Sequence, residues 1–104
     1  MPLSLLLIFL ATPMLIAQTI DELQRVEDWE IQLSRARQLT KSQQFAEADP
    51  LYQLLTTAAE RFQFPLPLRA KVHNNYGSML HAAARFAGAE AEYKLAIALW
   101  TRAN

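Results

Sequence analysis

The chain has 104 residues, with ten basic and ten acidic side chains, two glycines and no cysteine. This length allows one domain at most, and the balanced charge provides no net field to attract nucleic acid. The lack of cysteine excludes disulfides, thiolate metal sites and a cysteine nucleophile. Ala, Leu, Gln, Glu and Arg are abundant, and no window alternates apolar and polar residues as a strand does, so we expect an all-α fold.

The segment 1–17 carries no charged side chain and has the sequence MPLSLLLIFLATPMLIA. A short apolar run, a helix breaker at Pro13 and a small residue at Ala17 are typical of a secretory signal peptide. We therefore predict cleavage after Ala17, a mature domain over residues 18–104, and export to the periplasm or the outside of the cell. A retained membrane anchor is the alternative, although a spanning helix usually needs about 20 apolar residues. A true start at Met14 is a further alternative, and membrane contact is expected only if the segment is retained.

The mature chain is expected to form four helices, arranged as two antiparallel hairpins over about residues 19–62 and 68–103. Thr19 and Glu22 have the spacing of a capping box, which predicts the start of the first helix. Pro50 is tolerated because it falls near the first turn of the second helix. The predicted helices span about residues 19–40, 45–62, 68–84 and 87–101.

An apolar pattern occurs twice along the chain. Each residue of the second copy follows its counterpart in the first by the same number of residues that separates Leu80 from Leu39. We call this constant separation the repeat register. The first copy consists of Leu39, Phe45, Ala48 and Tyr52, and the second consists of Leu80, Phe86, Ala89 and Tyr93. A constant period of this length indicates stacked helical hairpins that bury surface against their neighbours. Repeat proteins of this kind mostly bind other proteins, so the pattern favours recognition over catalysis.

The segment from Ala70 to about Ala103 resembles the tetratricopeptide repeat (TPR). The residues that carry this resemblance are Asn75, Tyr76, Gly77, Leu80, Phe86, Ala89, Tyr93 and Ala96. Gly77 and Ala89 stand where that family brings its two helices closest together. The stretch FAEADPLY at residues 45–52 is similar to the longer repeat variant of kinesin light chains. The resemblance covers about residues 29–103 and implies two TPR-like hairpins in a right-handed α-solenoid.

In that family the first helix of each hairpin lines a concave groove that holds a peptide or a helix. Carried over to this chain, the candidate groove residues are Lys71, Asn74, Asn75, Ser78 and His81, with Glu30, Arg37 and Gln38 as weaker counterparts in the first hairpin. Asparagine amides can both donate to and accept from a peptide backbone. The resemblance therefore implies a non-enzymatic module that binds a protein or peptide and uses no cofactor.

Residues with catalytic or metal-binding potential do not form a convincing pattern. His73 and His81 are eight residues apart on one predicted helix, about 12 Å, which is too far to chelate one metal ion. Glu90 and Glu92 are two apart, so they do not face each other and are expected on solvated surfaces. Ser78 lies three residues before His81, yet no carboxylate is placed to orient that histidine. We expect neither an enzyme nor a metal site nor a nucleic-acid site.

Two hairpins are few for a repeat protein, since about three are usually needed for stability. The last helix carries Leu95, Ile97 and Trp100, more apolar surface than one packing face requires. We expect a homodimer through the carboxy-terminal hairpin. The alternatives are a structural oligomer that associates only with itself or is tethered to a membrane, and a truncated fragment of a longer TPR array.

Overall fold

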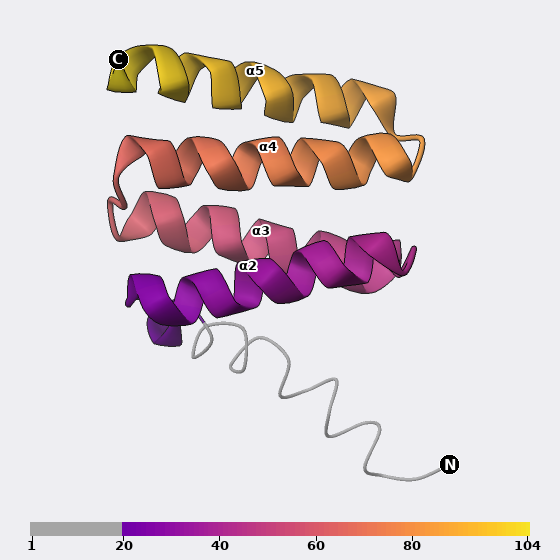
Figure 1. Cartoon of the computed structure of the whole chain (residues 1–104), viewed down its shortest axis with the longest axis horizontal. Coiled ribbons are helices and arrows are strands. Elements are labelled where there is room, and N and C mark those ends of the chain that lie inside the picture. Colours follow the sequence, from indigo (N-terminus) through magenta and orange to yellow (C-terminus); the bar gives the residue numbers. More distant parts are fainter. Residues whose placement is uncertain (1–19) are drawn as a thin grey trace, which may run out of the picture.

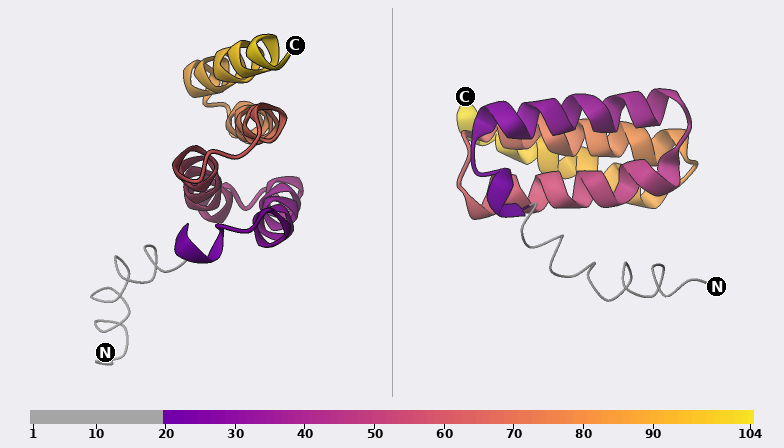
Figure 2. Two further views of the ribbon diagram at one scale, coloured as in Figure 1. Left: turned by 90° about the vertical axis from the view of Figure 1, so that its left-hand side faces the viewer. Right: turned by 90° about the horizontal axis from the view of Figure 1, so that it is seen from below.

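The computed structural model describes residues 20–104 and contains four main helices. They are α2 (Val26–Lys41), α3 (Phe45–Arg61), α4 (Leu66–Ala82) and α5 (Phe86–Ala103). Consecutive helices run in opposite directions and pack as adjacent pairs, from α2 at one end to α5 at the other (Figure 1). Seen along the helices, they form a staggered column (Figure 2). The all-α prediction is confirmed, and the bounds of α3, α4 and α5 lie within two residues of those expected.

The prediction of one continuous helix over residues 19–40 is wrong. A short helical turn at residues 20–22 is followed by a break at residues 23–25, and α2 begins only at Val26. The break allows Ile20 and Leu23 to fold back onto the helical pair, where they are 8% and 2% exposed. Burying these two side chains outweighs the few backbone hydrogen bonds that a continuous helix would add. Thr19 of the capping box and the signal-like segment 1–17 lie outside the described residues.

The three connections between helices repeat one backbone conformation. Each has a residue with positive φ, namely Gln43 (60°), Gln63 (51°) and Ala84 (62°). In each turn the following amide donates to a carbonyl five residues earlier, as from Arg85 N to Leu80 O at 2.8 Å. This is the left-handed helix ending that usually contains glycine, formed here without one.

Trp29 lies at the centre of the hydrophobic core. Its side chain is fully buried, and its Nε1 donates to the carbonyl of Leu55 at 2.9 Å. The indole also meets the ring of Phe64 edge to face, with 5.3 Å between centroids. The other large side chains that are fully buried are Leu33, Tyr52, Leu55, Val72 and Met79. The core therefore joins α2, α3 and α4.

The residues of the repeated apolar pattern lie in packing positions, except for Phe86. Gly77 and Ala96, which belong to the TPR resemblance, also lie in packing positions. Ala48, Tyr52, Gly77, Leu80, Ala89 and Ala96 are buried, and Leu39, Phe45 and Tyr93 are partly buried. Phe86 is 60% exposed, because it begins α5 at the open side of the stack, where its ring meets that of His81 with 5.1 Å between centroids. Within residues 20–104 no helix is both long and apolar enough to cross a membrane.

Candidate functional site

A hollow of about 160 Å³ lies between α2 and α4. It is lined by Arg37, Thr40, Lys41, Tyr52, Asn75 and Ser78. Residues three and four apart on a helix share a face, which is why Arg37, Thr40 and Lys41 meet at the end of α2 while Asn75 and Ser78 meet on α4. The hollow thus lies between α2, the first helix of one pair, and α4, the first helix of the other.

Tyr52 from α3 contributes a buried wall behind this hollow. Its side chain is 1% exposed and stacks on Tyr76 of α4 with 5.4 Å between ring centroids. Burial raises the pKa of the Tyr52 phenol above its ordinary value, so the group stays neutral at physiological pH. Thr40 beside it uses its hydroxyl to donate to Ala36 O at 3.0 Å.

Of the five candidate groove residues, the structure brings Asn75 and Ser78 to the hollow. Lys71 lies 3.9 Å from the carboxylate of Glu30, so this pair links α4 to α2 outside the hollow. Asn74 is exposed and does not line the hollow, and its carbonyl accepts from Ser78 Oγ at 3.2 Å. His81 is exposed and packs against Phe86. Among the weaker candidates, Arg37 lines the hollow, whereas Glu30 and Gln38 do not.

The amide nitrogen of Asn75 is the most informative atom of this site. Nδ2 is buried, and within the described part of the chain it has no hydrogen-bond partner. A buried donor that lacks a partner costs about 1–3 kcal/mol. Its neighbours in the hollow include the cations Arg37 and Lys41. The arrangement is therefore suited to an incoming oxygen acceptor, either a peptide carbonyl or a carboxylate.

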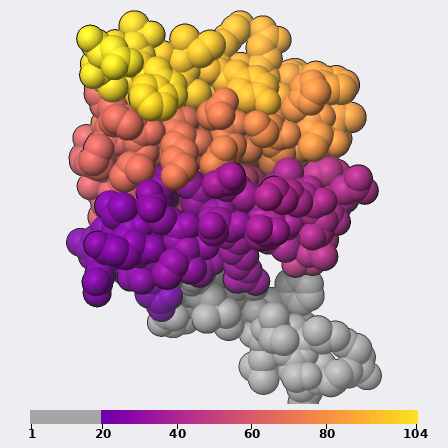
Figure 3. All heavy atoms as spheres, in the orientation of Figure 1, coloured from indigo at the N-terminus to yellow at the C-terminus, as the bar shows by residue number. Residues whose placement is uncertain are grey.

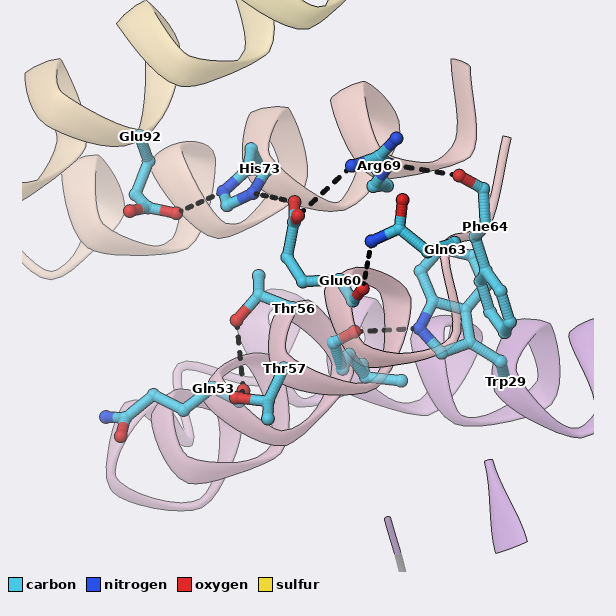
Figure 4. A network of polar contacts seen from close by, with 11 residues as sticks. Trp29, Gln53, Thr56, Thr57, Glu60, Gln63, Phe64, Arg69, His73 and Glu92 are labelled. Carbon is cyan, nitrogen blue, oxygen red and sulfur yellow. Dashed lines mark hydrogen bonds and ion pairs between the residues drawn. The ribbon is translucent and has the colours of Figure 1, made fainter. Parts of the chain in front are cut away.

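A polar network on α3, α4 and α5 includes one residue that we expected on a solvated surface (Figure 4). His73 Nδ1 lies 2.8 Å from Glu92 Oε1, and its Nε2 lies 3.8 Å from Glu60 Oε1. Arg69 completes the network by donating to Glu60 Oε2 at 3.1 Å and to Phe64 O at 2.9 Å.

The expectation for Glu92 is wrong, because its side chain is only 17% exposed. The rotation of α5 against α4 places it over His73. Glu90 does remain exposed, paired with Lys94 at 3.0 Å. No sequence signal marks the contact between His73 and Glu92, which are 19 residues apart.

A second cluster is centred on Asp49 of α3. Its carboxylate accepts hydrogen bonds from Tyr76 at 2.5 Å, Arg85 at 2.6 Å and Gln53 at 3.1 Å. Burial alone would raise the pKa of Asp49, but these three donors hold it below its ordinary value. Burial, together with the bond to Asp49, raises the pKa of Tyr76 to about 12.

Both clusters are satisfied within the chain, so their evident role is to join the first helical pair to the second. No group of three or more metal-ligating side chains within residues 20–104 is placed to hold a metal ion. We take the hollow at Asn75 as the candidate binding site because it contains a buried amide nitrogen that has no partner within the described residues. Comparison with models of protein families, with curated proteins and with solved structures finds no match to this chain.

Proposed function

We propose that the protein is a non-enzymatic binding module that holds an extended peptide or protein segment against α2 and α4. The observation that carries this proposal is the buried, unpartnered amide of Asn75 beside two cations. A bound main-chain carbonyl would accept from Asn75, and a nearby carboxylate on the ligand would face Arg37 and Lys41. Acidic peptides are therefore the expected ligand class.

The volume of the hollow favours a peptide as the ligand over a small molecule that the protein would enclose. Its volume of about 160 Å³ is below the range of about 300–1,000 Å³ that is common for small-molecule sites. A strip of peptide needs to bury only one or two side chains there while its backbone runs along the surface. The TPR resemblance supports the same arrangement, with α2 and α4 on the inner side of a right-handed solenoid.

If this proposal is right, Asn75→Ala should stabilise the fold and weaken peptide binding at the same time. Removing an unsatisfied buried donor and adding alanine, the best helix former, should raise the free energy of unfolding by about 1 kcal/mol. The same change removes the donor that the peptide needs, so it should weaken peptide binding. A residue that is retained at the expense of stability is expected at a binding site.

The test is selection of random ten-residue peptides displayed on phage against the full chain. The selected peptides should carry net negative charge, and each should bind Asn75→Ala about three- to tenfold more weakly than the unmodified chain, the equivalent of one lost hydrogen bond to a neutral carbonyl. Asn74→Ala is the matched control, because this neighbour has the same side chain and does not line the hollow. Selection of no peptide, or of peptides that bind Asn75→Ala as well as the unmodified chain, would overturn the proposal.

The proposed location is outside the cytoplasm, in the cell envelope or beyond the cell. It rests on the signal-like segment 1–17. Expression of the full chain in a secreting host, followed by mass spectrometry, tests it. An amino terminus at Gln18 supports export, whereas an intact segment in the membrane fraction indicates an anchor instead.

A further inference from the structure

Apolar side chains are exposed at both ends of the stack. On α5, Leu95, Ile97 and Trp100 are 47%, 65% and 46% exposed, and on α2 Ile31 is 63% exposed. Figure 3 shows α5 in yellow along one edge of the molecule and α2 in violet toward the other. Among the four main helices, α5 packs mainly against α4, and α2 packs against α3 and α4. Residues 21–25 border a hollow on α2 beside Asp28, Ile31 and Arg35, which leaves this face open between them.

The repeat register relates these two open surfaces to an interface that the chain already contains. The helix α3 contacts α4 through Asp49, Tyr52 and Glu60, and moving these positions forward by the repeat register gives Glu90, Tyr93 and Thr101 on α5. The helix α4 contacts α3 through Arg69, His73 and Tyr76, and moving these back by the same separation gives Asp28, Gln32 and Arg35 on α2. Of these positions, Glu90 and Thr101 are exposed on α5, and Asp28 and Arg35 are exposed on α2, whereas Tyr93 packs against Gly77 of α4. The exposed positions therefore place counterparts of the α3–α4 contact at the two ends of the stack.

We infer that α5 of one copy docks on α2 of a second copy, head to tail, in the manner of α3 on α4. This inference is independent of peptide binding, because it uses the ends of the stack and not the hollow at Asn75.

One pair of side chains that would meet in this contact is complementary in charge. The register of the Asp49–Tyr76 hydrogen bond brings Glu90 of one copy to Arg35 of the second copy. Both are exposed, and Glu90 otherwise pairs only with Lys94 of its own helix at 3.0 Å within the described residues. Glu90 and Arg35 thus stand where Asp49 and Tyr76 form a hydrogen bond within the chain. Their opposite charges favour this alignment of the two helices over others.

The proposed contact also covers apolar side chains that are exposed in the single copy. Ala59 on α3 and Val72 on α4 are 1% and 0% exposed within the chain. The equivalent positions are Trp100 on α5 and Ile31 on α2, so each of these exposed apolar residues takes a position that is buried in the internal interface. A hollow of about 440 Å³ between α2 and α3 runs beside Arg35 and is lined in part by Ile20, Leu39, Leu51 and Leu54, so apolar surface lies next to the proposed contact.

A symmetric dimer of two α5 helices is the competing arrangement. It would cover Trp100 but would leave Ile31 and Arg35 without a partner. A head-to-tail contact uses different surfaces on the two copies and does not close after two, so the average mass should keep increasing with concentration.

The test is sedimentation velocity on the full chain and on charge-exchange variants. Glu90→Arg and Arg35→Glu should each place like charges at every contact and weaken self-association at least about tenfold, since opposed like charges cost more than 1 kcal/mol. An equimolar mixture of the two variants should associate again, because every contact in an alternating assembly then joins opposite charges. Circular dichroism of each variant establishes that these exposed substitutions leave the helices intact. Arg61→Glu on α3 is the control, and it should associate like the unmodified chain.

Three results would overturn the inference. The unmodified chain could remain monomeric at every concentration, which would mean that the two ends do not dock on each other. Arg35→Glu could associate as strongly as the unmodified chain, which would indicate a symmetric contact between α5 helices. The mixture could also fail to associate, which would exclude a contact between positions 90 and 35.

Discussion

Replacing Gly77 with alanine tests the close approach of α4 and α5. A Cβ atom at this position would lie 2.8 Å from both Cδ1 and Cε1 of Tyr93 and 3.3 Å from the carbonyl oxygen of Ala89. Carbon atoms in van der Waals contact are about 3.5–4.0 Å apart, so the ring must move by roughly 1 Å. Overpacking of this kind costs about 1–3 kcal/mol, and the better helix propensity of alanine returns about 0.5–1 kcal/mol. We expect Gly77→Ala to lower the free energy of unfolding by about 0.5–2 kcal/mol.

The chain offers a matched control in Gly88→Ala on the facing helix. There the new Cβ would lie 3.3 Å from Cδ1 of Leu80, the flexible end of a side chain that can give way. This variant should be within about 0.5 kcal/mol of the unmodified chain or slightly more stable. Urea unfolding followed by circular dichroism measures both, and the melting temperature should fall by about 4–8 °C for each kcal/mol lost.

Tyr93 is the group that must move, so its removal should relieve the strain. In the Tyr93→Leu background, Gly77→Ala should lose its penalty, giving a coupling energy of about 1 kcal/mol between the two positions. The reasoning is refuted if Gly77→Ala is as stable as the unmodified chain. A penalty that persists unchanged without the tyrosine ring would refute it too.

Other expectations concern the turns, the core and the response to pH. Ala84→Gly should raise the free energy of unfolding by about 0.5–1 kcal/mol, because glycine adopts the positive φ of 62° without strain; an equal or lower stability in urea unfolding would contradict this. Trp29→Phe should lower the free energy of unfolding by about 2–4 kcal/mol, because it loses the hydrogen bond to Leu55 and leaves a cavity. Trp100→Phe at the surface should change the free energy of unfolding by less than about 0.5 kcal/mol. The raised pKa of Tyr76 means that its contribution to stability is complete below pH 10 and is lost as the pH rises toward about 12. The lowered pKa of Asp49 has the opposite sign, so its contribution is complete above its ordinary pKa and is lost as the pH falls through the folded-state value. Thermal melts across this range should show that Tyr76→Phe removes part of the alkaline loss, and an unchanged alkaline profile would count against the Asp49–Tyr76 bond.

Much of the fold could be predicted because local chemistry decides where helices begin and end. Pro65 is the N-cap of α4 and Pro67 lies in the first turn of that helix, so the two prolines mark the boundary between α3 and α4. Pro50 lies inside α3, beyond its first turn, so its position near the helix start does not account for its tolerance. The repeated apolar pattern marked packing positions on α3, α4 and α5, with the exposed Phe86 as the exception. Small residues at Gly77 and Ala89 indicated the close helix contact that the structure contains.

The candidate site could be predicted only in part. Of the residues that the resemblance implied for a peptide groove, Asn75, Ser78 and Arg37 line the hollow, and Lys71, Asn74 and His81 do not. That any of them binds a peptide stays a prediction. On a helix, one residue changes the direction of a side chain by about 100°, so the rotation of α4 against α2 determines which of these neighbours meets the hollow. That rotation depends on packing across the whole pair of helices.

The sequence by itself determined the all-α class, the approximate bounds of α3, α4 and α5 and the repeat register that relates one pair to the other, because these follow from short-range spacing along the chain. Only the tertiary structure decided the break before Val26, the contact of His73 with Glu92 and the three bonds to Asp49. In each case the decision depends on residues brought together by helix packing, where burial and hydrogen bonding between distant positions outweigh local preference.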